Sequence, residues 1–102
     1  MLVGTVMLDI HMAPNQTHRA DVQKLLVHPD IRRRGVARRL MERLESEARA
    51  AGRTLLVLDT RAGDAAEALY RGTGWHEAGR VPDFAVNADG SLSPTVWFWK
   101  KL

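Results

Sequence analysis

The sequence contains no cysteine, and this absence excludes disulfide bonds, thiolate zinc sites and catalysis by a thiol nucleophile. No apolar run approaches the roughly 18 residues that a membrane-spanning helix needs. No charged segment precedes the first apolar residues, so we expect no secretory signal, no membrane partner and a cytoplasmic location. The 4 histidines lack the spacing of metal ligands, so we also predict no metal site.

Aromatic residues are scarce at 6%, and the net charge is +3. The basic excess is concentrated between Arg32 and Arg53, a pattern that suits nucleic acid or a phosphorylated cofactor. Binding to single-stranded nucleic acid would require aromatic residues interleaved with these arginines. Trp97, Phe98 and Trp99 instead stand together near the C-terminus. We therefore disfavour a nucleic-acid partner.

Length and composition fit one small globular domain. The chain has 102 residues, of which 45% are hydrophobic and 26% are charged. A chain of this size buries one core and little more, and this balance is typical of folded rather than disordered chains. We expect a single domain over residues 1–102.

Hydrophobic periodicity predicts an α+β fold with the order β-β-α-β-α-β-β. The run Leu55–Leu58 is continuously apolar, which favours a central strand buried on both faces and parallel to an earlier strand. Asp64 followed by Glu67 resembles a capping box at a helix start. The expected strands are 2–12, 21–27, 55–58, 76–81 and 95–101, and the expected helices are 36–51 and 64–71.

The turn before the first predicted helix has the features of an anion site. Free N–H groups and the positive end of the helix dipole attract phosphate at such a place. Gly35 allows close approach of the backbone, and Ala37 keeps the first helical turn unobstructed. Arg32, Arg33 and Arg34 add positive charge. A basic, solvated helix start would carry the same arginines, so these residues alone leave both interpretations open.

Three segments together resemble a known family. Arg32-x-x-Gly35-x-Ala37 fits the Arg/Gln-x-x-Gly-x-Gly/Ala motif of the GNAT acetyltransferases, which cradles the diphosphate of acetyl-CoA. Segments 25–29 and 68–75 match the family in order and spacing, so the chain resembles a GNAT domain over residues 2–102. Stretches 18–25, 58–60 and 87–95 look closer still to the tabtoxin resistance protein, a member of this family.

The resemblance implies that acetyl-CoA is the acyl donor and a small-molecule amine the acceptor, with direct transfer in a ternary complex. It places backbone groups of Leu25, Leu26 and Val27 against the pantetheine arm and the acetyl carbonyl. The residues that it places around the diphosphate are Arg32, Arg33, Arg34, Gly35, Val36, Ala37 and Arg38.

The resemblance also implies catalytic roles. Tyr70, the only tyrosine, stands where the family has its general acid, although a tyrosine packed against the sheet would look the same. Asp21 stands where some members have a catalytic glutamate, and Asp59 ends a buried strand where ligands gather. Either carboxylate could instead be structural, with Asp21 paired to Arg19 and Asp59 capping the loop that follows.

A full domain of the family would carry a strand, two helices and a further strand before Leu2, so the resemblance implies an N-terminally truncated domain. Uncovered apolar sheet favours self-association, and we expect a homodimer. Trp97 and Trp99 share one face of the last strand, where core or dimer packing is favoured over ligand stacking. The alternative function is a non-catalytic, dimeric module that binds coenzyme A.

Overall fold

The computed structural model describes residues 4–27 and 35–102, and it confirms the predicted order of strands and helices. The last two strands are longer than predicted, and the first is shorter. The elements are β1 (Gly4–Asp9), a short 3-10 turn η1 (Pro14–Gln16), β2 (Arg19–Val27), α1 (Val36–Ala50), β3 (Leu55–Arg61), α2 (Ala65–Gly72), β4 (His76–Val86) and β5 (Leu92–Lys101).

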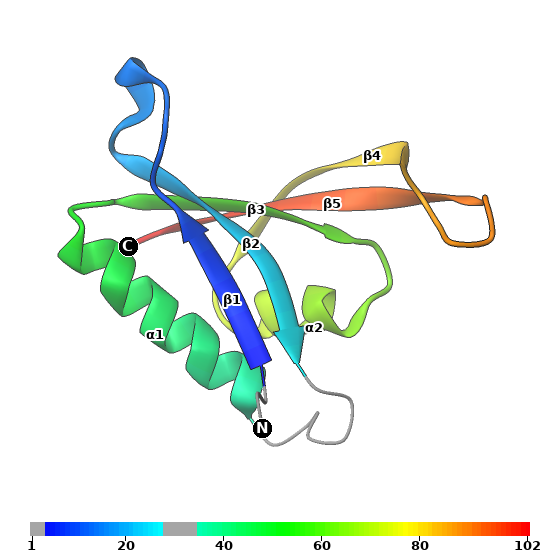
Figure 1. The fold of residues 1–102 in the computed structure, drawn as a ribbon, viewed down its shortest axis with the longest axis horizontal. Helices are drawn as coiled ribbons and strands as arrows, with labels where there is room; N and C mark the ends of the chain where they lie inside the picture. The colour runs from blue at the N-terminus through cyan, green and yellow to red at the C-terminus, as the bar shows by residue number, and fades with distance from the viewer. Residues whose placement is uncertain (1–3, 28–34) are drawn as a thin grey trace.

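The strands form one five-stranded sheet in the order β1-β2-β3-β5-β4. β2 and β3 are parallel, as the apolar run in β3 predicts, and the other neighbours are antiparallel. Both helices lie on the same side of this sheet, and the β4–β5 hairpin extends beyond them (Figure 1). No helix in residues 4–27 and 35–102 is long and apolar enough to cross a membrane.

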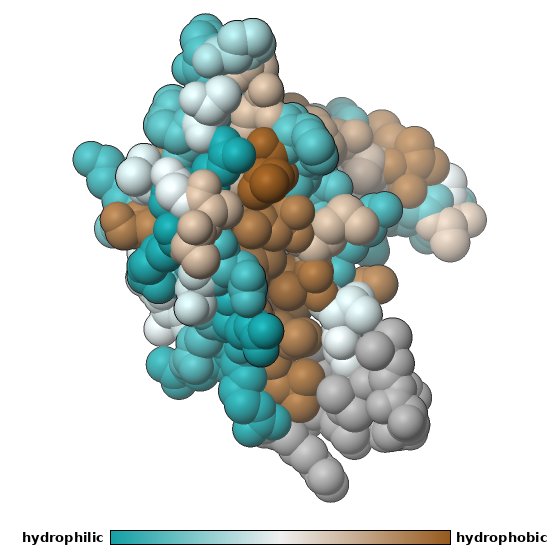
Figure 2. Space-filling model, turned by 60° about the vertical axis from the view of Figure 1, so that its left-hand side comes forward, coloured by the Kyte–Doolittle hydropathy of each residue, from teal (hydrophilic) through white to brown (hydrophobic). Residues whose placement is uncertain are grey.

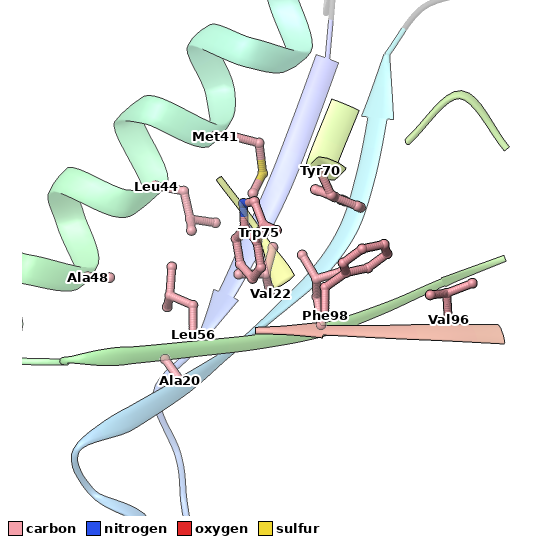
Figure 3. Packing of buried hydrophobic residues seen from close by; sticks show 11 residues of the cluster. Ala20, Val22, Met41, Leu44, Ala48, Leu56, Tyr70, Trp75, Val96 and Phe98 are labelled. Atoms are coloured by element: carbon pink, nitrogen blue, oxygen red, sulfur yellow. The ribbon is translucent and has the colours of Figure 1, made fainter. Parts of the chain in front are cut away.

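The hydrophobic core fills the space between the helices and the sheet (Figure 3). Apolar positions at helical spacing on α1 meet apolar positions at alternating spacing on the strands. The largest side chains of this core that are fully buried belong to Phe98, Met41, Leu56 and Val96. Other buried members are Ala20, Val22, Leu44, Ala48, Leu58, Tyr70 and Trp75.

The opposite side of the sheet has no helix over it in the part of the chain that the structure describes. Successive strand residues point to opposite faces, so the neighbours of buried residues on β2, β3 and β5 point away from both helices. We call this surface the open face. Its residues include Asp9, Arg19, Asp21, Leu55, Val57, Asp59, Arg61, Trp97, Trp99 and Lys101, together with His76, which stacks on Trp99.

One local prediction about the helices is wrong. Asp64 is the N-cap residue of α2, but its side chain makes no capping hydrogen bond, and the Glu67 side chain pairs with arginines on α2 and β4, so the predicted capping box does not form. On α1, Arg38 and Glu42 form an i,i+4 ion pair at 3.7 Å. Ala51 is the exposed C-cap of this helix, and Met41 belongs to its buried stripe.

Candidate active site

The parallel strands β2 and β3 pair over three positions and then diverge. Arg19 pairs with Leu55, Ala20 with Leu56, and Asp21 with Val57. Beyond this point β2 continues beside β1 and β3 continues beside β5, as Figure 1 shows. We call the place where residues 22–27 and 58–61 no longer pair the strand separation. Along it, the described backbone of β2 has a ladder partner on one side only, so amide groups remain available to a ligand.

A bulge shapes β2 along the strand separation. Thr5 pairs with Leu26 and Met7 with Gln23, so Val6 alone stands opposite Lys24 and Leu25. Lys24 has a φ of 54°, in the left-handed region that side chains other than glycine rarely adopt. Bulges bend a strand and redirect its backbone groups, and they are common beside active sites. Leu25, Leu26 and Val27, expected to contact the donor, lie on this separated half of β2.

The N-terminus of α1 has the properties required of an anion site. Gly35 is its N-cap with a φ of 71°, and a Cβ there would meet no atom within 4 Å. Among the described residues, no side chain caps the helix and no acidic residue occupies its first turn. The first-turn N–H groups therefore keep their positive potential. Val36 and Ala37 are half-buried and Arg38 is exposed. These residues fit a diphosphate.

Arg32, Arg33 and Arg34 lie outside the described residues, so their expected role stays a prediction.

Tyr70 is only 4% exposed and lies on the helix side of the sheet. Its ring centroid is 5.7 Å from that of Trp75 and 5.9 Å from that of Phe98. Phe98 pairs with Leu58, the first β3 residue beyond the β2 pairing, so Tyr70 lies near the strand separation. Burial raises the pKa of Tyr70 to about 12. The phenol therefore stays protonated at neutral pH, and among the described residues its hydroxyl makes no hydrogen bond.

The two candidate bases lie on the open face, and their partners differ. Arg19 forms an ion pair with Asp21 at 2.5 Å, the structural role weighed for this carboxylate. Thr95 Oγ1 lies 2.8 Å from Asp59 Oδ2 and can donate to it. Asp59 is exposed and, within residues 4–27 and 35–102, has no ion-pair partner. The structure thus brings the acid and base candidates to opposite faces of the sheet.

Sequence reasoning missed Thr95. This residue is 3% exposed, and its hydroxyl can also donate to the carbonyl of Thr60 at 3.0 Å. No local pattern marks such a residue, because its role depends on the pairing of β5 with β3.

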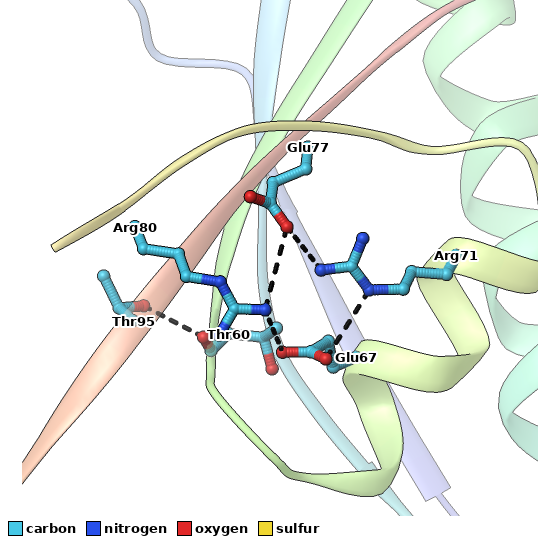
Figure 4. Close-up of polar contacts among 6 residues, drawn as sticks. All are labelled: Thr60, Glu67, Arg71, Glu77, Arg80 and Thr95. Atoms are coloured by element: carbon cyan, nitrogen blue, oxygen red, sulfur yellow. Dashed lines mark hydrogen bonds and ion pairs between the residues drawn. The ribbon is translucent and has the colours of Figure 1, made fainter.

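Polar contacts hold α2, and with it Tyr70, against the strands. Arg71 bonds to Glu77 of β4, and its guanidinium carbon lies 5.1 Å from the centroid of the Phe98 ring. Glu67 joins Arg71 at 3.5 Å and Arg80 at 3.7 Å, which closes the network in Figure 4. The hydrogen bond from Arg71 lowers the pKa of Glu77.

A second contact ties the end of α2 to α1. Lys100 of β5 lies 2.9 Å from Glu45 of α1 and donates to the carbonyl of Thr73 at 2.7 Å. Glu45 is 7% exposed, so this ion pair is largely removed from water. Together the two sets of contacts fix α2 at both of its sides.

Comparison with known proteins gives a consistent result. The model of the acetyltransferase (GNAT) family matches residues 2–75. An IAA acetyltransferase from Azospirillum brasilense is 43% identical over 60 residues, which cover 58% of this chain and 39% of that protein. The ribosomal-protein-alanine N-acetyltransferase of Brucella melitensis superposes with a TM-score of 0.86 at 25% identity, over 98% of this chain and 62% of that one.

The fold is also that of yncA from Salmonella typhimurium, solved with its cofactor acetyl-CoA. The TM-score is 0.88 at 21% identity, over 100% of this chain and 59% of that one. The chain thus spans less than two thirds of the length of each of these proteins.

Proposed function

Because this chain belongs to the GNAT family of acetyltransferases, we propose that it binds acetyl-CoA and transfers the acetyl group to the nitrogen of a small-molecule amine. The observation that carries the proposal is the strand separation next to the uncapped N-terminus of α1. It combines an anion site with unpaired strand backbone, the two features that a long phosphorylated thioester requires. The similarity to the ribosomal-protein-alanine N-acetyltransferase of Brucella melitensis supports nitrogen as the acceptor atom.

The donor binds by its diphosphate at Gly35, Val36, Ala37 and Arg38, with Arg32, Arg33 and Arg34 supplying further charge. The helix dipole and the first-turn N–H groups favour the anion there. The pantetheine arm lies along the backbone of residues 25–27. An N–H of this segment stabilises the negative charge that develops on the thioester oxygen, which is the largest electrostatic contribution in acyl transfer.

In the reaction the amine nitrogen attacks the thioester carbonyl carbon, and the carbon–sulfur bond breaks. The proton of the attacking nitrogen passes to Asp59, directly or through water, and Tyr70 gives its proton to the leaving sulfur. We favour Asp59 over Asp21 as the base, because the Asp21 carboxylate is engaged by Arg19. Transfer is direct, in a ternary complex, and the absence of cysteine excludes a thioester intermediate on the chain.

The raised pKa of Tyr70 suits this role in one respect and opposes it in another. A phenol with a pKa of about 12 gives its proton to a thiolate of ordinary pKa, about 8.5, at a cost of about 5 kcal/mol. A dry site disfavours both anions, however, so the thiolate becomes more basic there as well. The proton therefore moves late, when negative charge has accumulated on the sulfur.

We propose that a second copy of the chain covers the groove between α1 and the edge strand β1. Figure 2 shows an apolar band there, and the groove, of about 470 Å³, is lined by Val6, Leu8, Leu40 and Leu44. Arg43 and Glu47 flank it and form an ion pair with each other at 3.0 Å. Sedimentation equilibrium tests this homodimer, and a monomer at high micromolar concentration would contradict it.

Calorimetric titration with acetyl-CoA tests the donor site. Gly35 and Gly52 lie at opposite ends of α1 with φ values of 71° and 77°, and neither has an atom near the place of a Cβ. Gly35→Glu and Gly52→Glu therefore impose the same backbone strain and the same charge. We expect micromolar binding by the unchanged chain and by Gly52→Glu, and binding at least about 100-fold weaker by Gly35→Glu. Equal affinities of the two variants would contradict the assignment.

A further inference from the structure

Cross-strand pairing places an acidic and an aromatic residue side by side on the open face. Asp59 of β3 is the register partner of Trp97 of β5, and both follow the point where β2 leaves β3. The next row along the same strands joins Val57 to Trp99, and Trp99 is paired with His76 of β4. Side chains of one row lie about 5 Å apart at their Cβ atoms. A ligand at the strand separation on this face meets Asp59 and Trp97 first.

An irregularity in β4 adds a second aromatic ring to this place. Val81 pairs with Thr95 and Ala85 with Ser93, so Pro82, Asp83 and Phe84 all stand opposite a single residue of β5. Asp83 takes a φ of 53°, in the left-handed region. The bulge brings Phe84 against Trp97, with ring centroids 6.2 Å apart and planes at 88°. Phe84 is 50% exposed.

The two tryptophans of the open face therefore differ. The His76 ring stacks on Trp99 at 4.5 Å and an angle of 30°, so one face of that indole is already covered. Phe84 meets Trp97 edge to face, an arrangement that forms a corner of two aromatic surfaces. Apolar walls with one well-placed polar group are typical of small-molecule sites.

One acidic oxygen at this corner has no partner among the described residues. The hydroxyl of Thr95 holds Oδ2 of Asp59, while Oδ1 has no hydrogen-bond partner among the described residues. The nearby acidic groups of the same face are Asp21 and its register partner Asp9, and Arg19 is already paired with Asp21. Hydrogen bonds from Ser91 lower the pKa of Asp89, and Arg61, which ends β3, adds to this effect. Arg61 and Lys101 are the register partners of Thr95 and Leu55, so they stand on the same face. The acidic oxygen left for a cation at this corner is therefore Oδ1 of Asp59.

We propose that the acceptor is a primary amine whose nitrogen is joined by a short linker to an aromatic ring, with no carboxylate beside the nitrogen. Its ammonium group binds Oδ1 of Asp59, and its ring packs in the corner of Trp97 and Phe84. This proposal rests on the proposed function and names its substrate class. It is narrower than the small-molecule amine that the family resemblance implies, and it excludes amino acids, because an amino acid would bring its carboxylate toward Asp59.

Calorimetric titration with three small probes tests the proposal without any acetyl transfer. The probes are 2-phenylethylamine, 2-phenylethanol, which lacks the charge, and phenylalanine, which adds a carboxylate. Each is titrated in the absence and in the presence of coenzyme A. We expect 2-phenylethylamine to bind at least about 10-fold more tightly than either of the others, as loss of one charged hydrogen bond predicts. No binding of the amine, or tighter binding of phenylalanine, would overturn the proposal.

Two matched pairs of variants locate the site. Asp59→Asn should weaken amine binding about 10-fold or more, while Asp9→Asn on the same face should change it less than about 2-fold. Trp97→Leu should weaken it about 5-fold, while Trp99→Leu, which removes the indole stacked on His76, should not. Trp97→Phe, which keeps a ring, should recover most of the loss. Equal effects within either pair would overturn the assignment to this corner.

The outcomes separate this proposal from the proposed function. Amine binding that depends on Asp59 and Trp97, without release of coenzyme A from acetyl-CoA, would support the acceptor site and contradict the reaction. Release of coenzyme A with amino acids but not with 2-phenylethylamine would support the reaction and overturn the aromatic acceptor.

Discussion

The two faces of the sheet are built from the same strands and have opposite compositions. On the helix side, alternate residues such as Leu56, Val96 and Phe98 are fully buried against α1 and α2. On the open face, the residues between them include Asp59, Trp97 and Trp99. A sheet that is buried on one face needs only polar residues on its other face to remain soluble. Carboxylates and indoles together exceed that need, and this suggests that the open face is used for binding.

The two faces of the sheet therefore have separate roles. The helix side holds the fold together and carries Tyr70, whereas the open face carries the carboxylates and has few packing partners of its own. Substitutions on the helix side should therefore act first on stability, and substitutions on the open face should act first on acceptor binding. Four experiments test this division, beginning with the largest expected effect.

Removing an aromatic ring from the core should cost the domain much of its free energy of unfolding. Phe98→Ala empties a fully buried site and should lower the free energy of unfolding by about 3–5 kcal/mol. Trp97→Ala, one residue away on the open face, should lower it by about 1 kcal/mol or less, since that side chain is only partly buried. Urea unfolding followed by circular dichroism measures both. Equal losses would show that the open face is packed in solution.

Tyr70→Phe separates chemistry from packing on the helix side. The ring contacts with Trp75 and Phe98 remain, so the affinity for acetyl-CoA should change by less than about 2-fold. Loss of the general acid should lower kcat about 100-fold. Loss of a hydroxyl that has no hydrogen-bond partner among the described residues should leave stability unchanged or slightly raised. A kcat within 3-fold of the unchanged chain would contradict the acid role, given that general acids contribute about 10²-fold or more.

The ionisation of Tyr70 is directly observable, because the chain has 1 tyrosine. With a pKa of about 12 in the folded state and about 10 in the unfolded state, the protonated form favours folding. That contribution, about 2–3 kcal/mol, is fully present below pH 10 and is lost as the pH rises toward 12. Tyrosinate absorbance at increasing pH measures the midpoint. A midpoint near 10 in the folded protein would show that Tyr70 is accessible to solvent.

The smallest effect concerns the exposed network of α2 and β4. Glu77→Gln removes the acceptor of Arg71 and should lower the melting temperature at pH 7 less than Phe98→Ala does, because exposed ion pairs contribute little. The lowered pKa of Glu77 means that its contribution exists above the usual pKa of a glutamate and is lost as pH falls through the folded value. The melting temperatures of the unchanged chain and of Glu77→Gln should therefore converge in acid. A constant difference down to pH 2 would contradict this.

Local patterns were sufficient to predict the order of elements. Apolar spacing located α1, the continuous run at Leu55–Leu58 located a central strand, and Gly35 marked a helix start. The divergence of β2 from β3 and the position of Thr95 could not be predicted, because both depend on pairing between distant strands. The bulges at Lys24 and Asp83 were missed for a related reason. Left-handed backbone at such residues is imposed by tertiary contacts against their own preference.

The residues of the candidate site also differ in how far the sequence could predict them. Gly35 and Tyr70 were assigned through a resemblance that is local in sequence, and the family match over residues 2–75 supports its basis. Asp21 and Asp59 both stayed candidates in the sequence, since Asp21 starts a predicted strand and Asp59 directly follows one. The structure distinguishes them by their partners, Arg19 for one and Thr95 for the other. Sequence reasoning could list the residues but could not place acid and base on opposite faces.

Steady-state kinetics test most directly whether donor and acceptor meet across the sheet. Because the chain contains no cysteine, a thiol reagent detects only the coenzyme A that is released. Acetyl-CoA and a primary amine, beginning with 2-phenylethylamine, are varied together, and the intact mass of the protein is followed. We predict that release requires the amine, that double-reciprocal lines intersect, and that the protein gains no acetyl group. Parallel lines with an acetylated protein, or release that is independent of any amine, would contradict the account.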